Sequence, residues 1–96
     1  MERHPLFSDI ESTYQIIKHH THKTPVLTSE SVNTILGVEI FLKCENFQKV
    51  GAFKFRGATN AVLRLTEDQA KRGVATHSSG NHAAALALAA KKRGIP

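Results

Sequence analysis

Residues 73–90 read GVATHSSGNHAAALALAA, and this stretch sets the expected fold. Gly73 to Thr76 is typical of the end of a short buried strand, His77 to Gly80 of a tight loop, and Asn81 onward of a helix of strong helix formers. The open backbone N–H groups and the dipole at such a helix start attract anions, and hydroxyl and amide side chains add further donors. Simple capping of the helix by Ser and Asn explains the same residues without any ligand, so both interpretations stay open.

A second stretch, residues 45–58, surrounds one lysine with apolar side chains. It reads ENFQKVGAFKFRGA, and Lys54 stands between Phe53 and Phe55. A lysine held in an apolar pocket has its charged form disfavoured, and its amine becomes a nucleophile suited to carbonyl chemistry. More often, a lysine flanked by phenylalanine lies at a helix edge with its stem buried and its ammonium in water.

The rest of the chain alternates between expected helices and strands. Ser8 to Glu11 has the sequence of a capping box, which predicts a helix running to about His20 with Ile10, Tyr14 and Ile17 on its buried face. A second helix is predicted over residues 29–36, ended by Gly37, and a strand over 38–43. A third helix is predicted from Lys54 to Leu65, with Ala58, Val62 and Leu65 on its buried face. A short helix that begins at Thr66 and a strand near Val74 are predicted to follow. The alternation predicts an α/β fold with an open, mostly parallel sheet and flanking helices.

Together the two stretches resemble the fold-type II pyridoxal-phosphate enzymes. The run around Lys54 matches the cofactor-attachment pattern of that family, and the SSGNH run at 78–82 matches the substrate loop of its serine/threonine dehydratases and serine racemases. The likeness extends from about Ser8 to the end of the chain. It implies a partial tryptophan synthase beta-like fold, with residues 1–76 in the large cofactor-binding domain and residues 77–96 at the start of the small domain.

The resemblance also implies roles for individual side chains. Lys54 would bind pyridoxal 5'-phosphate covalently and later take the α-proton of an amino-acid substrate. Phe53 would lie along the cofactor ring, and Asn81 would hydrogen-bond its phenolic oxygen. The substrate carboxylate would be held by the loop and helix start, through Ser78, Ser79, Gly80, Asn81 and His82. In serine racemases a serine that matches Ser79 returns a proton on the face opposite the lysine, so Ser79 is a second catalytic candidate.

The implied activity is that of a pyridoxal-phosphate-dependent serine/threonine dehydratase. Such an ammonia-lyase converts L-serine or L-threonine to a 2-oxo acid and ammonia, and Ser79 leaves serine racemase activity open. The family's phosphate-binding loop lies well beyond residue 96, so we expect the 96 residues alone to fold poorly and turn over little substrate. The alternative is a truncated, non-catalytic remnant of such an enzyme. Relatives are commonly dimers, so a homodimer is expected of the full-length enzyme.

Composition narrows the remaining classes. The chain has 13 Lys and Arg against 8 Asp and Glu, a net charge of +5, which favours small anionic ligands. The basic residues are dispersed, so nucleic acid is not an expected partner. Cys44 is the single cysteine, which rules out an intrachain disulfide and fits a reducing compartment. No signal peptide or apolar run of membrane-spanning length is present in the sequence, which predicts a cytoplasmic protein without a membrane partner.

Overall fold

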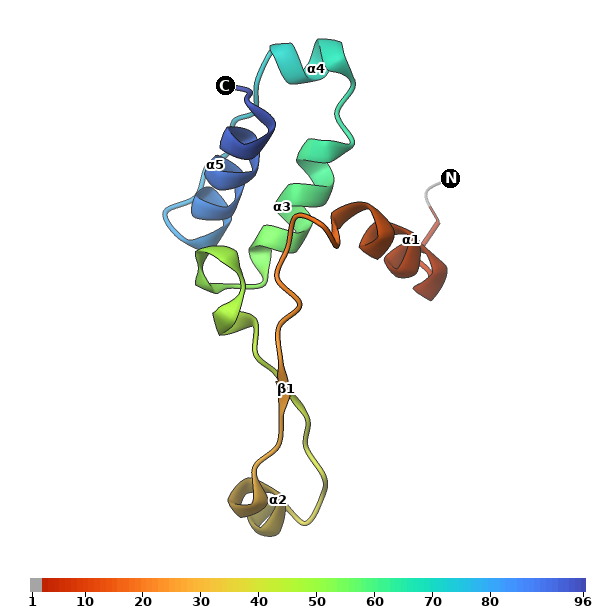
Figure 1. Ribbon diagram of the computed structural model, residues 1–96, viewed down its shortest axis with the longest axis vertical. Helices are drawn as coiled ribbons and strands as arrows, with labels where there is room; N and C mark the ends of the chain where they lie inside the picture. The colour runs from red at the N-terminus through yellow and green to blue at the C-terminus, as the bar shows by residue number, and fades with distance from the viewer. Residues whose placement is uncertain (1–2) are drawn as a thin grey trace.

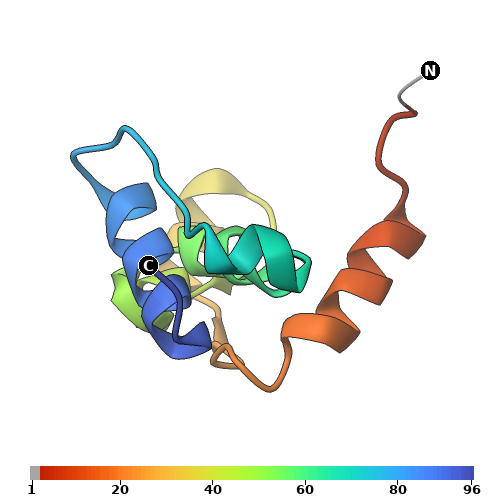
Figure 2. The ribbon, with the colours of Figure 1, turned by 90° about the horizontal axis from the view of Figure 1, so that it is seen from above.

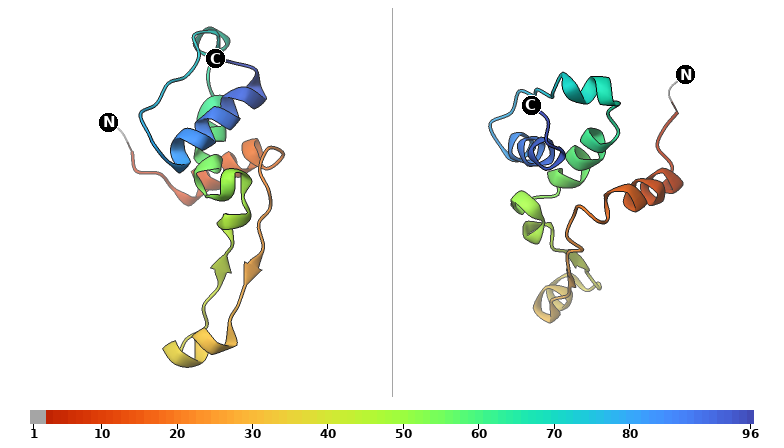
Figure 3. Two further views of the ribbon diagram at one scale, coloured as in Figure 1. Left: turned by 90° about the vertical axis from the view of Figure 1, so that its left-hand side faces the viewer. Right: turned by 45° about the horizontal axis from the view of Figure 1, so that its top comes forward.

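The computed structural model describes residues 3–96, which form a helical body and a long protruding arm (Figures 1 and 3). The molecule measures 53 × 32 × 25 Å along its principal axes. Its regular elements are α1 (Phe7–Ile17), β1 (Val26–Leu27), α2 (Glu30–Leu36), β2 (Leu42–Lys43), the 3-10 helices η1 (Glu45–Phe47) and η2 (Lys49–Gly51), α3 (Lys54–Leu63), α4 (Glu67–Lys71) and α5 (Asn81–Arg93). We call residues 26–43 the arm and residues 45–96 the body.

The core of the body is the contact between α3 and α5. Phe55, Ala58 and Val62 of α3 are 0–4% exposed and recur at helical spacing, so they form one buried stripe. Ala85 and Ala89 of α5 face this stripe, and their small side chains let the two helices approach closely. The predicted inner face of α3 is confirmed at Ala58 and Val62. The helix itself ends earlier than predicted, at Leu63.

The first helix differs from its prediction in its cap and in its burial. It begins at Phe7, and the carboxylate of Asp9, rather than Ser8, accepts a 2.7 Å hydrogen bond from the backbone N–H of Leu6. Of the predicted buried face only Ile17 is buried, while Ile10 is 62% exposed and Tyr14 41% exposed. The periodicity is therefore present, but α1 meets the body only near its C-terminal end, where Ile17 is buried and Thr13 accepts a 3.5 Å hydrogen bond from Arg64 (Figure 2).

The arm is a two-stranded antiparallel ribbon with a helix at its tip. Val26 pairs with Lys43 and Leu27 with Leu42. The tip helix α2 has the predicted ends: Ser29 Oγ accepts from the Val32 amide at 3.3 Å, and Gly37 closes the helix in the left-handed conformation with φ +67°. None of the arm residues is buried.

The mostly parallel sheet expected from the sequence is not formed within residues 3–96. The predicted strand over 38–43 is paired only at Leu42 and Lys43, and the segment near Val74 has no strand partner. A strand needs a hydrogen-bonded neighbour, and the described residues supply one only within the arm. Val74 nevertheless donates its N–H to the carbonyl of Pro96 at 3.0 Å, which brings the end of the chain beside the α4–α5 connection.

A half-buried polar network joins the segment after α1 to the body. The carboxylate of Glu45 forms an ion pair with Arg56 and accepts a 2.6 Å hydrogen bond from Thr24 Oγ1. Gln48, 3% exposed, exchanges two hydrogen bonds with the backbone of His22, at 2.8 and 2.9 Å. These side chains fix the path of residues 21–24 against η1 and α3.

Candidate active site

The starts of α3 and α5 lie side by side and form a groove. On the α3 side the groove is lined by Phe53, Lys54, Gly57, Ala58 and Ala61, and on the α5 side by His82 and Leu86. Its volume is about 310 Å³, which is in the range of small-molecule sites. Helix packing in the body therefore creates a hollow at the position of the lysine that the sequence singled out.

Lys54 is the first residue of α3 and is exposed, so the predicted apolar enclosure of its side chain is wrong for residues 3–96. Adjacent helical positions point about 100° apart, and the core takes the next residue, Phe55, with 0% exposure. Phe53 is 61% exposed and lies beside the lysine, with the Lys54 Nζ atom 5.2 Å from the centroid of the Phe53 ring. An aromatic surface on one side thus replaces the expected pocket.

The backbone before Lys54 makes a sharp turn that sets the start of α3. Val50 and Gly51 both have left-handed φ angles, +59° and +74°, which is unusual for a β-branched residue such as valine. Two residues after the lysine, Arg56 holds the pKa of the Glu45 carboxyl at about 2, below its ordinary value of 4.5, chiefly through a direct hydrogen bond. The lysine therefore lies between a constrained turn and an anchored ion pair.

The loop before α5 is organised by Ser78. Its Oγ accepts hydrogen bonds from the backbone N–H groups of Gly80 at 3.2 Å and Ala83 at 3.3 Å, so this hydroxyl caps the helix. Because both bonds use the oxygen as acceptor, the hydroxyl proton of Ser78 is free to donate. The amides of Asn81 and His82, in the first turn of α5, have no acceptor within the helix and can bind an anion.

The predicted site residues fall into two adjoining groups. Phe53, Lys54 and His82 line the same groove. Ser78, Ser79, Gly80 and Asn81 lie in the loop and first helical residue that lead to His82, and of these only Ser78 is not fully exposed.

Sequence reasoning missed other residues that line the groove. Gly57 and Ala61 follow Lys54 at spacings of three and seven, and Leu86 follows His82 at a spacing of four. Helical spacing from the two predicted residues would have found all of them.

The described residues suit pyridoxal phosphate, the cofactor that the sequence resemblance implies, better than they suit a metal ion. A primary amine beside an exposed aromatic ring suits an aromatic aldehyde, and the open amides at the start of α5 suit a carboxylate. Within residues 3–96 no group of three or more His, Cys, Asp or Glu side chains is placed to hold a metal.

The groove has the chemical features of the class of enzyme that attaches an aldehyde cofactor to a lysine. A family model described as pyridoxal-phosphate dependent enzyme matches residues 17–96, and the chain belongs to that family. The predicted family and its cofactor, pyridoxal phosphate, are thereby confirmed.

Individual relatives give the same result. A serine racemase of Arabidopsis thaliana is 64% identical over 87 residues, which cover 91% of this chain and 26% of that protein. A beta-hydroxyaspartate dehydratase of Paracoccus denitrificans is 54% identical over 96% of this chain and 29% of its own length. The solved structure of maize serine racemase superposes with a TM-score of 0.87 at 54% identity, over 91% of this chain and 27% of that one.

These likenesses confirm the predicted fold class and the enzymatic nature of the family. The chain spans about a quarter to three tenths of the length of the relatives it matches. In the part of the chain that the structure describes, no helix is long and apolar enough to cross a membrane.

Proposed function

We propose that the protein carrying this chain is a pyridoxal-phosphate-dependent lyase that dehydrates a small β-hydroxy amino acid, with L-serine or L-threonine as substrate. The observation that supports it most is the meeting of Lys54, Phe53 and the start of α5 in one groove. The names of its relatives, serine racemase and beta-hydroxyaspartate dehydratase, concern amino acids of the same kind.

Each groove residue has a role in this proposal. Lys54 attaches the cofactor through Nζ and, once released by the substrate amine, takes the α-proton at the same atom. Phe53 lies along the cofactor ring, and Asn81 binds its phenolic oxygen. When bound, the cofactor would supply an electron sink for the pair left on the α-carbon. The β-hydroxyl would then leave as water, with the proton that Lys54 Nζ had taken from the α-carbon.

The start of α5 orients the substrate. Its carboxylate is held by the open amides of Asn81 and His82 and by the hydroxyl proton of Ser78, whose oxygen is already fixed by two backbone donors. Ser79 and Gly80 complete the loop around the carboxylate. His82, with the apolar Leu86 behind it, forms the α5 wall of the groove that holds the lysine.

A second candidate activity is racemisation of serine. Racemisation needs a proton carrier on each face of the α-carbon, whereas elimination needs only the lysine. Ser79 is the candidate for the second face because it is exposed and precedes the groove residue His82 by three positions. The similarity to proteins named serine racemase supports this second activity.

The test is chemical trapping followed by product analysis. Borohydride reduction of the protein in the presence of pyridoxal phosphate should leave the reduced adduct on the peptide that contains Lys54, and K54A should abolish it. K49A, which changes a lysine outside the groove, is the matched control and should keep the adduct. An adduct on another lysine, or none, contradicts the proposal and favours a non-catalytic remnant.

Product analysis separates the two activities. With L-serine we expect release of a 2-oxo acid and ammonia, and S79A should lower this release less than it lowers the formation of D-serine. D-serine formed by the unaltered protein and lost in S79A would assign racemisation to Ser79. The division of the chain near Thr76 into two domains and a homodimeric assembly are further proposals, for which limited proteolysis and sedimentation are the tests.

A further inference from the structure

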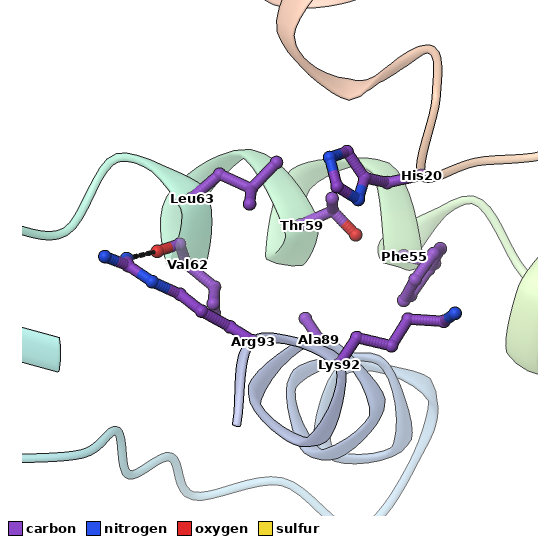
Figure 4. A pocket seen from close by; sticks show the side chains of 8 residues that line it. All are labelled: His20, Phe55, Thr59, Val62, Leu63, Ala89, Lys92 and Arg93. Carbon is purple, nitrogen blue, oxygen red and sulfur yellow. Dashed lines mark hydrogen bonds between the residues drawn. The ribbon is translucent and has the colours of Figure 1, made fainter. Parts of the chain in front are cut away.

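A second, smaller cavity lies on the body between α3, α5 and the segment that follows α1 (Figure 4). Its volume is about 40 Å³, and it is separate from the groove that holds Lys54. Apolar side chains, among them Phe55, Val62 and Ala89, form most of its wall.

The cavity contains an unsatisfied polar group. Thr59, on α3, is 4% exposed, and its Oγ1 is buried and has no hydrogen-bond partner among residues 3–96. Figure 4 shows this oxygen turned toward the space between the His20 ring and Phe55. A buried hydroxyl without a partner destabilises the fold, so such groups usually have a bound water or ion beside them.

The charges around the cavity are all of one sign. His20, Lys92 and Arg93 line it, and among residues 3–96 no aspartate or glutamate does. Lys49 is close by, since its Nζ lies 5.6 Å from the centroid of the Phe55 ring and donates a 2.6 Å hydrogen bond to the carbonyl of His20. Burial, and after it the neighbouring Lys92, lower the pKa of Lys49.

The nearest acidic partner is engaged away from the cavity. Glu67, whose side chain is 85% exposed, accepts a hydrogen bond from Arg93 at 3.2 Å. The same guanidinium group also donates to the carbonyls of Val62 and Leu65, as Figure 4 shows for Val62. Arg93 is thus held in place, and the exposed Lys92 is the other cationic side chain that lines the cavity.

Size then limits what the ligand can be. A cavity of about 40 Å³ accommodates one particle of about the size of a water molecule, which occupies about 30 Å³ in the liquid. A phosphate group or an amino-acid carboxylate is too large. We propose that this cavity binds one monoatomic anion of the halide class, which accepts a hydrogen bond from the Thr59 hydroxyl and is neutralised by Lys92. The apolar walls suit a large, weakly hydrated ion.

The experiment compares halide with a bulky anion in the protein carrying this chain. Thermal unfolding is measured in sodium bromide and in sodium gluconate at equal ionic strength, for the unaltered protein and for T59V. We expect bromide to raise the melting temperature of the unaltered protein by about 2–4 °C. T59V should show no bromide effect, and in gluconate it should melt higher than the unaltered protein, because it no longer buries an unpartnered hydroxyl.

T24V is the matched control. Thr24 has the same 4% exposure, but its hydroxyl donates to Glu45. T24V should therefore lower the melting temperature and keep the bromide effect. A bromide-soaked crystal should show an anomalous peak beside Thr59. Water only in the cavity, a bromide effect that persists in T59V, or a T59V protein that loses stability in gluconate would each overturn the proposal. None of these readouts depends on the proposed catalytic activity.

Discussion

The body and the arm contain apolar side chains of the same kinds but use them differently. In the body, Phe55 and Val62 are at most 1% exposed and pack against the alanines of α5. In the arm, Ile35 is 80% exposed and Phe41 67% exposed. The body therefore obtains its order from contacts within the described residues, whereas the arm is held by its own backbone hydrogen bonds and caps.

The comparison also locates the chemistry. The groove with Lys54 lies on the body, at the helix starts that the packing of α3 on α5 brings together. The segment that leads from α1 into the arm is connected to the body by the polar network around Glu45, Arg56 and Thr24. Substitutions in the body, in the connection and in the arm should thus change the free energy of unfolding by different amounts. Each substitution tests one part of the comparison.

The largest effect is expected at the centre of the body. F55A removes a fully buried ring from the α3–α5 contact and should lower the free energy of unfolding by about 3–5 kcal/mol. Denaturant titration of the protein carrying this chain measures it. F41A is the control in the arm and should change stability much less. An equal loss of stability in F55A and F41A would contradict the view that side-chain packing stabilises the body but not the arm.

An intermediate effect is expected at the connection, and it depends on pH. The folded-state pKa of Glu45 is about 2, below the ordinary value of 4.5, so its contribution is complete above pH 4.5 and is lost as the pH falls toward 2. It is about 1–3 kcal/mol, discounted for partial exposure. E45Q should lose stability at neutral pH and show a shallower decline in acid. An unchanged acid profile in E45Q would contradict the assignment.

Two glycines should respond in opposite directions. Gly57 lies within α3 with ordinary helical angles and no atom within 4 Å of an added Cβ, so G57A should stabilise the unliganded protein by about 0.5–1 kcal/mol. Gly37 has φ +67° at the tip of the arm, so G37A should destabilise by about 1 kcal/mol. Melting temperatures measure both.

The same glycine substitution also sharpens the proposed function. The methyl group of G57A projects into the groove beside Lys54, so less borohydride-trapped cofactor should form although the fold is more stable. Equal trapping in G57A and in the unaltered protein would mean that the cofactor does not approach this part of α3.

The smallest effect is expected at the arm surface. I35A should change the free energy of unfolding by less than about 0.5 kcal/mol, because the side chain is already 80% exposed. The same denaturant titration measures it. A loss of several times this size would show that another surface covers the arm and would break the comparison.

Local signals predicted most of the helix ends. Ser29 and Gly37 bound α2 as expected, and Thr66 with Gln69 forms the capping box that opens α4. These motifs depend on residues within one or two turns of each other, so the sequence contains both partners. The predicted burial of Ile10 and the strand at Val74 depended on surfaces that α1 and the α4–α5 connection do not meet within residues 3–96.

The candidate site was predicted in part, because its motifs can be read from the sequence whereas its packing cannot. Motif resemblance identified Lys54 and the loop at Ser78, and the structure brings the lysine and His82 to one groove. Within residues 3–96 Lys54 follows the alternative of an exposed lysine at a helix edge, because Phe55 turns into the core while Phe53 stays 61% exposed. The orphaned hydroxyl of Thr59 had no sequence signal at all, since it results from the packing of three distant segments.

The close approach of Gly73 to Pro96 makes residues 73–96 a closed loop that contains α5. A Cβ atom at position 73 would lie 2.8 Å from the carbonyl oxygen of Pro96, the same oxygen that accepts the Val74 amide. Closing a loop of this length costs little more conformational entropy than closing a shorter one, so one backbone hydrogen bond contributes to holding the two ends together. Deuterium exchange at the Val74 amide consequently reports whether α5 is packed on α3. The hydrogen bond from Val74 to Pro96 should open together with α5 as one cooperative unit.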